Sequence, residues 1–119
     1  MRLLALIAVA GAVAVTPVRV TITASHTVKA NAKWPVTIRV TNAAGKPLRG
    51  TLTNRILLGS LVVGKVDNGR VWHFVGTWRE PKGQEITWPA SARGQTFNFQ
   101  TIVHVGKRTV KKAFPVSVR

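Results

Sequence analysis

The sequence contains no cysteine, no tyrosine and only three acidic side chains, Asp67, Glu80 and Glu85. Without cysteine the chain can form neither a disulfide nor a thiolate metal site, so its stability must come from an apolar core. Paired-carboxylate hydrolases, calcium sites and two-metal phosphatases need several converging acids. We therefore expect the chain to build none of these sites.

Positive charge, by contrast, is abundant. Eighteen Lys and Arg residues give a formal net charge of +15, and such a charge attracts polyanions over long distances. The chain has 119 residues, of which 45% are hydrophobic. This composition predicts a single folded domain with a modest core rather than a disordered chain.

The N-terminal sequence is typical of a secretory signal peptide. Met1 and Arg2 precede an uncharged apolar run from Leu3 to Val15, which ends near the small residues Ala12 and Ala14. The run is too short to span a bilayer. We predict a signal peptide over 1–14, a domain over 15–119 and a secreted or cell-surface location; the alternative is that the run forms a first strand or helix of the domain.

From Val18 onward the apolar residues alternate with polar ones. Val18, Val20 and Ile22 alternate with Arg and Thr, and the segment from Val36 to Val40 follows the same pattern. This period of two is typical of antiparallel strands with one buried face. Strands are expected near 18–24, 34–42, 50–58, 61–66, 70–78, 84–88, 95–105 and 108–118.

Two of these strand pairs can be given a register. An Asn68-Gly69 turn would place Val66 opposite Val71 and Val63 opposite Phe74. A Gly106-Lys107 turn would place Val103 opposite Val110, Phe99 opposite Phe114 and Phe97 opposite Val116. The second register also pairs Thr101 with Lys112, whose ammonium group we expect to reach water.

Seven to eight short strands in one domain predict an immunoglobulin-like antiparallel β-sandwich, an all-β fold. The stretch from Val36 to Leu48, which contains Gly45-Lys46-Pro47, resembles the opening strands of bacterial immunoglobulin-like surface domains, and the pair 95–105 and 108–118 resembles their closing strands. The resemblance implies a spacer, stalk or adhesive module without catalytic residues.

No catalytic, cofactor or metal site is predicted. The three histidines, His26, His73 and His104, lack the spacing of zinc ligands. Serines are present, but the sequence has no nucleophile elbow, and Asp67 belongs to a predicted turn. We therefore expect no enzyme activity and no cofactor.

The expected contacts are diffuse and electrostatic. Candidate polyanion-binding residues are the cluster near the last turn and the arginines on outer strand faces: Lys107, Arg108, Lys111, Arg19, Arg39 and Arg55. The expected partner is an anionic cell-envelope polymer or another surface protein. Nucleic acid is disfavoured, because the aromatic residues lie on the apolar stripes rather than between the basic residues.

Two other functions remain open. The chain could be a filament or assembly subunit that keeps its apolar N-terminal segment and inserts it into a neighbour by strand addition. It could also be an intracellular nucleic-acid-binding protein, which would explain the charge but not the run from Leu3 to Val15.

Overall fold

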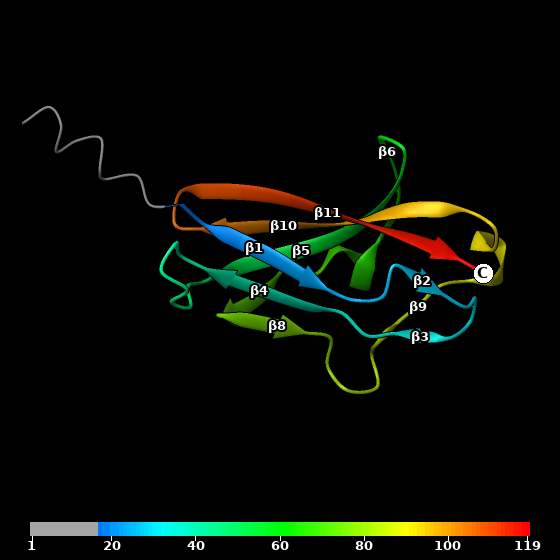
Figure 1. Cartoon of the computed structure of the whole chain (residues 1–119), viewed down its shortest axis with the longest axis horizontal. Coiled ribbons are helices and arrows are strands. Elements are labelled where there is room, and N and C mark those ends of the chain that lie inside the picture. The colour runs from blue at the N-terminus through cyan, green and yellow to red at the C-terminus, as the bar shows by residue number, and fades with distance from the viewer. Residues whose placement is uncertain (1–16) are drawn as a thin grey trace, which may run out of the picture.

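The computed structural model describes residues 17–119, and the predicted signal peptide lies outside these residues. The domain is built from β-strands (Figure 1). Nine of them form one continuous hydrogen-bonded sheet. Eight strands follow one another in the order β1-β4-β8-β7-β5-β10-β11-β2, and β6 pairs with β5 outside this order. A separate ribbon pairs β3 with β9. The strands are β1 (Arg19–Thr23), β2 (Thr27–Val28), β3 (Lys33–Trp34), β4 (Thr37–Thr41), β5 (Arg49–Leu58), β6 (Leu61–Lys65), β7 (Trp72–Val75), β8 (Thr77–Arg79), β9 (Ile86–Thr87), β10 (Thr96–Val105) and β11 (Arg108–Val118).

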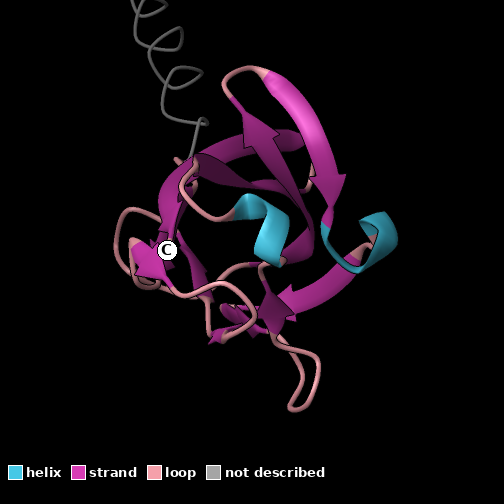
Figure 2. Ribbon diagram, turned by 90° about the vertical axis from the view of Figure 1, so that its right-hand side faces the viewer, coloured by secondary structure: helices cyan, strands magenta, loops and turns pink. Residues whose placement is uncertain are grey.

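The sheet folds over on itself at Gly76, between β7 and β8. One layer contains β1, β4 and β8, and the other contains β7, β5, β10, β11 and β2. Figure 2 shows the strands curving around the centre of the domain. Gly76 has a φ of 75°, and its amide N–H donates to the Leu48 carbonyl at 2.7 Å. A Cβ atom on Gly76 would lie 2.7 Å from the Cβ of Pro47. Glycine is therefore needed here for both the backbone conformation and the close approach.

The predicted pairing of the last two strands is confirmed. In the β10–β11 hairpin Phe99 lies opposite Phe114, Phe97 opposite Val116 and Val103 opposite Val110. Thr101 is fully buried, whereas its partner Lys112 is exposed, as expected for a lysine that reaches water. The register follows from the apolar pattern, because a slip by a single residue would turn these side chains to the outer face.

The predicted Asn68-Gly69 hairpin is wrong. Asp67 and Asn68 both have positive φ, and with Gly69 they form a left-handed turn, η1 (Val66–Gly69), that does not bring β6 and β7 together as partners. β6 instead folds back on β5 through a turn at Gly59 and Ser60. β7 pairs with the first half of β5, and Gly50 takes the place opposite Phe74 that was predicted for Val63. β5 has ten residues, so β7 and β6 can pair with it one after the other along its length.

The fold class is confirmed, although the strands are more finely divided than predicted. Pro35 separates β3 from β4, and Gly76 separates β7 from β8. The short strand β2 was not predicted, because Thr27 and Val28 show too little alternation; it pairs in parallel with the end of β11.

Aromatic rings fill the centre of the domain around Trp34. Its ring contacts Trp88 and Phe99 edge-on, with centroids 5.7 and 5.2 Å away. The Trp34 indole N–H donates to the Ser25 carbonyl at 2.8 Å, so this buried ring has no unsatisfied donor. Phe114, by contrast, is only half buried and stacks on His26.

The two facing phenylalanines are expected to differ in their contribution to stability. Phe99→Ala should lower the free energy of unfolding by about 3–5 kcal/mol, because the substitution leaves a cavity around a fully buried ring. Phe114→Ala should cost less, since part of that ring already contacts water. Urea denaturation of both variants measures the two losses of unfolding free energy. Equal losses would contradict the prediction that the more deeply buried Phe99 contributes more.

Candidate functional site

Threonine and arginine side chains cover the outer face of the layer β1-β4-β8. In β1 and β4 the apolar residues point inward, so Arg19 and Arg39 point outward with the threonines between them. The register places Thr21 opposite Arg39, and Thr37 opposite Arg79 of β8. Arg79 was not among the predicted residues, although Thr77-Trp78-Arg79 repeats the Thr-x-Arg pattern of Thr37-Ile38-Arg39 and could have identified it.

A groove of about 550 Å³ crosses this face, and we call it the Thr/Arg groove. Its lining combines hydroxyl groups, two guanidinium groups and the corner at Gly76: Thr21, Thr23, Thr37, Arg39, Pro47, Val75, Gly76, Thr77 and Arg79. Guanidinium groups bind carboxylate, phosphate and sulfate in a bidentate manner. The groove therefore has the chemistry to hold an anionic group.

The other predicted basic residues do not join this groove. Arg55 and Lys111 lie on β5 and β11, in the opposite layer, where Arg55 is half buried and its Nε donates to Gln100 Oε1 at 2.7 Å. Lys107 and Arg108 lie at the turn between β10 and β11. The positive charge is thus spread over two faces and one end, which agrees with diffuse attraction rather than a single basic site.

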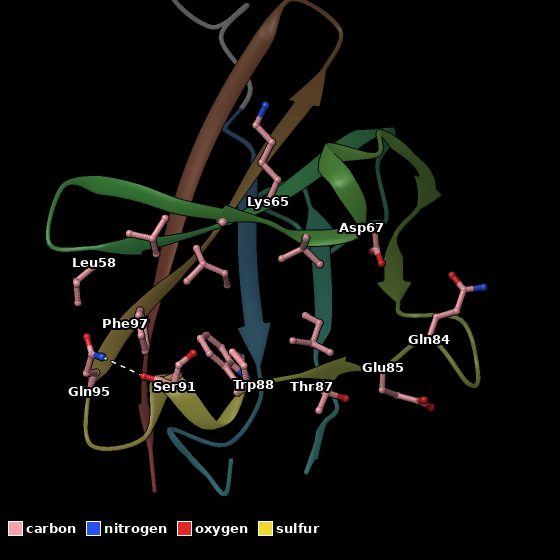
Figure 3. Close-up of a pocket in the computed structure, with 17 residues that line it drawn as sticks. Leu58, Lys65, Asp67, Gln84, Glu85, Thr87, Trp88, Ser91, Gln95 and Phe97 are labelled. Atoms are coloured by element: carbon pink, nitrogen blue, oxygen red, sulfur yellow. Dashed lines mark hydrogen bonds between the residues drawn. The ribbon is translucent and has the colours of Figure 1, made fainter. Parts of the chain in front are cut away.

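A second hollow, the β6–β9 cleft, opens between the β5–β6 hairpin and the segment around β9. It has a volume of about 650 Å³, and Figure 3 shows the residues around it. Ile56 and Val63 lie on the hairpin side, and Trp88 and Phe97 on the opposite side. Polar side chains, among them Asp67, also line it. No sequence pattern predicted this cleft, because the pairing of β6 was predicted incorrectly.

Two of the three acidic side chains, Asp67 and Glu80, lie close together beside the cleft. Glu80 follows β8 and is only 8% exposed, and neither of its carboxylate oxygens has a hydrogen-bond partner in the described part of the chain. Burial first, and then the nearby charges of Asp67 and Glu85, raise the pKa of Glu80 to about 8. Glu80 is therefore largely protonated at neutral pH, so its carboxyl group is a potential hydrogen-bond donor.

Glu85 has a different environment. Its carboxylate accepts a hydrogen bond from the Gly83 amide at 3.0 Å and lies 4.0 Å from the ammonium group of Lys33. Backbone hydrogen bonding, first, and the nearby lysines keep the pKa of Glu85 below its usual value. Glu85 is thus a satisfied surface carboxylate, and the unpaired charge belongs to Asp67 and Glu80.

The histidines stay apart from both hollows. His26 stacks on Phe114, and His104 Nδ1 lies 3.0 Å from the hydroxyl of its cross-strand partner Thr109. Within residues 17–119, no three His, Cys, Asp or Glu side chains are grouped closely enough to hold a metal ion. The same residues contain no helix with the length and apolarity needed to cross a membrane.

Comparison with known proteins supports the fold. No protein-family model and no curated protein sequence matches the chain. Among solved structures, the CARDB domain of the PF1109 protein from Pyrococcus furiosus, crystallised in complex with di-metal ions, is similar with a TM-score of 0.51. The two share 14% sequence identity over 87% of this chain and 93% of that domain. At this identity the likeness shows the immunoglobulin-like β-sandwich fold alone.

The buried acid pair predicts that stability falls as the pH rises. The pKa of Glu80 is 4.5 in an ordinary environment and about 8 in the folded protein, so the folded state binds more protons between these values. The stabilisation is complete below pH 4.5 and is lost as the pH rises through 8, with a slope of up to about 1.4 kcal/mol per pH unit. Urea unfolding across this range measures the slope.

Glu80→Gln is the matched control for this experiment. The amide keeps the shape of the side chain and can still donate a hydrogen bond, but it does not titrate. The variant should show a flat profile over the same range and exceed the parent in stability at the alkaline end. An unchanged slope in Glu80→Gln would assign the pH dependence to other groups.

Proposed function

We propose that the protein is a non-catalytic, exported immunoglobulin-like module that holds anionic polymers of the cell envelope. The observation that carries this proposal is the lack of acidic partners for its basic residues. Over residues 17–119 the structure contains a single ion pair between a basic and an acidic side chain, Lys33 with Glu85. The other Lys and Arg side chains of these residues make no ion pair within them, and their charges can act on an external polyanion.

The Thr/Arg groove is the place where these charges are best arranged. Arg39 and Arg79 share the outer face of adjacent strands, with Thr37 paired opposite Arg79. Guanidinium groups can bind the anionic groups of a polymer, and threonine hydroxyls can bind its uncharged oxygen atoms. The basic residues outside the groove add long-range attraction without specificity. The β-sandwich fold, shared with the CARDB domain, is suited to such a spacer or binding module.

Polyanion binding should depend steeply on salt. Each phosphate or sulfate group that the protein neutralises releases condensed counterions, so retention on a dextran sulfate column should fall sharply between about 50 and 200 mM salt. A neutral β-sandwich of equal size serves as the reference. A protein that passes the column at low salt with the reference would contradict the proposal.

Variants test the part played by the groove. The double variant Arg39→Gln/Arg79→Gln should elute at lower salt than Lys29→Gln/Lys82→Gln, which removes the same charge elsewhere on the exposed surface. Any single substitution should have a small effect, because no one contact carries the affinity. Complete loss of retention from a single change would indicate a specific pocket instead.

The second candidate function is an assembly subunit, and the open edge of β6 favours it. Among the described strands β6 pairs with β5 alone, and Leu61, Val62 and Val63 on it are 66%, 40% and 47% exposed. An unpaired apolar edge is a template for adding a strand from another chain. In this hypothesis the added strand is the apolar segment from Leu3 to Val15 of a neighbouring copy.

The assembly hypothesis predicts that a charge on the β6 edge blocks association. Val62→Lys should keep the full-length chain monomeric in sedimentation velocity, whereas Val75→Lys, at an exposed position on β7 away from that edge, should not. N-terminal sequencing of the native protein separates the two functions. Cleavage after Ala14 supports the exported module, and an intact segment in an extracellular polymer supports the subunit.

A further inference from the structure

The β6–β9 cleft has the features of a ligand site, and the polyanion function does not use it. Its volume of about 650 Å³ lies within the usual range for sites that bind small molecules. Trp88 and Phe97 give it an aromatic wall, with ring centroids 5.5 Å apart. Gln84, Thr87, Ser91 and Gln95 surround this wall with exposed polar side chains (Figure 3).

Two buried groups at the cleft lack hydrogen-bond partners. Trp88 lines the cleft and is 3% exposed, yet no acceptor for its indole N–H exists within the described residues. Asp67 lines the cleft as well, and its Oδ2 is buried without a donor beside the equally unpaired carboxyl group of Glu80. Buried polar groups without partners are costly, and a ligand that donates to one group and accepts from the other would satisfy both.

The basic residues nearest the cleft leave Asp67 and Glu80 without a counter-charge. Lys65 lines the cleft from β6, but its ammonium end points away from Trp88 and Glu85 in Figure 3. Lys33 pairs with Glu85, and Lys82 acts electrostatically on the same carboxylate. The acid pair therefore remains the uncompensated negative charge of a protein that is otherwise strongly positive.

We propose that the β6–β9 cleft binds an amino sugar, with its ammonium group at Asp67, beside the buried carboxyl group of Glu80, and its ring against Trp88 and Phe97. A sugar ring presents apolar C–H faces to aromatic side chains, and its hydroxyls can accept from the Trp88 indole N–H and bond to the polar rim. The ammonium group supplies the positive charge that the acid pair lacks. The site is separate from the Thr/Arg groove and does not depend on its function.

Binding should be coupled to proton release. A cation beside Asp67 and Glu80 favours the ionised form of Glu80, so the proton on Glu80 is displaced into solvent. Affinity should therefore rise with pH from about 5 to about 7, the part of the range below the folded pKa of Glu80 in which the sugar amine is still protonated. A site that recognises only the sugar ring would show no such dependence.

The test is an NMR titration of the full-length protein with three sugars of similar shape and different charge. Glucosamine, glucose and glucuronate are cationic, neutral and anionic, and the indole N–H of Trp88 is the local reporter. Glucosamine should shift this signal and bind at least about tenfold more tightly than glucose, the factor expected for a charge-assisted hydrogen bond. Glucuronate should bind most weakly at this site.

Conservative variants assign the charge effect to the acid pair. Asp67→Asn keeps a residue that tolerates the left-handed backbone at this position (φ 53°), and Glu80→Gln keeps the shape of its side chain. Both should lower the glucosamine affinity to that of glucose. Glu80→Gln should also remove its pH dependence, whereas Asp67→Asn keeps the buried carboxyl group of Glu80, which still titrates. Arg39→Gln, in the Thr/Arg groove, is the control and should leave glucosamine binding unchanged.

Three outcomes would overturn the proposal. Equal affinities for glucosamine and glucose would show that the acid pair does not take part. Tightest binding of glucuronate would show that the basic surface governs the site. No shift of the Trp88 indole signal with any sugar at millimolar concentration would show that the cleft is not a sugar site.

Discussion

The packing around Trp34 supports both the core and the β6–β9 cleft. Trp34 lies on the short strand β3, outside the continuous sheet, and its ring is 1% exposed between the two layers. It contacts Phe99 of β10 on one side and Trp88 on another. In a chain without disulfides, such contacts replace covalent ties between layers. Since Trp88 belongs to the core and also lines the cleft, the cleft has a rigid wall.

A difference in burial explains why two regions of opposite charge coexist in one small domain. The basic side chains lie on outer strand faces, where water screens them and they can repel one another at little cost. Asp67 and Glu80 meet at the end of β8, where burial penalises ionisation and raises the pKa of Glu80 to about 8. Protonation of Glu80 lets the two groups lie together without a cation, at a cost in stability that grows with pH. Such perturbed groups are often found at functional sites.

The β5–β6 hairpin is the least protected part of the fold and borders the cleft. Its apolar residues, such as Leu61 and Val62, face solvent, and Lys65 is the single charge on β6. An edge strand of this kind is open to pairing unless a partner or charge covers it. The strand also closes one side of the cleft, so that ligand binding and strand addition would act on the same element.

The sequence by itself determined the all-β class and the register of β10 with β11, because local alternation fixes which side chains share a face. The outward Arg and Thr residues followed from the same alternation. It predicted the wrong partner for β6: the Asn68-Gly69 pattern predicted pairing with β7, whereas β6 pairs with β5, which is long enough to take β6 and β7 end to end. It also could not foresee the acid pair. Asp67 and Glu80 are brought together only when the chain folds over at Gly76 and places the end of β8 beside the left-handed turn, an arrangement that local pattern does not encode.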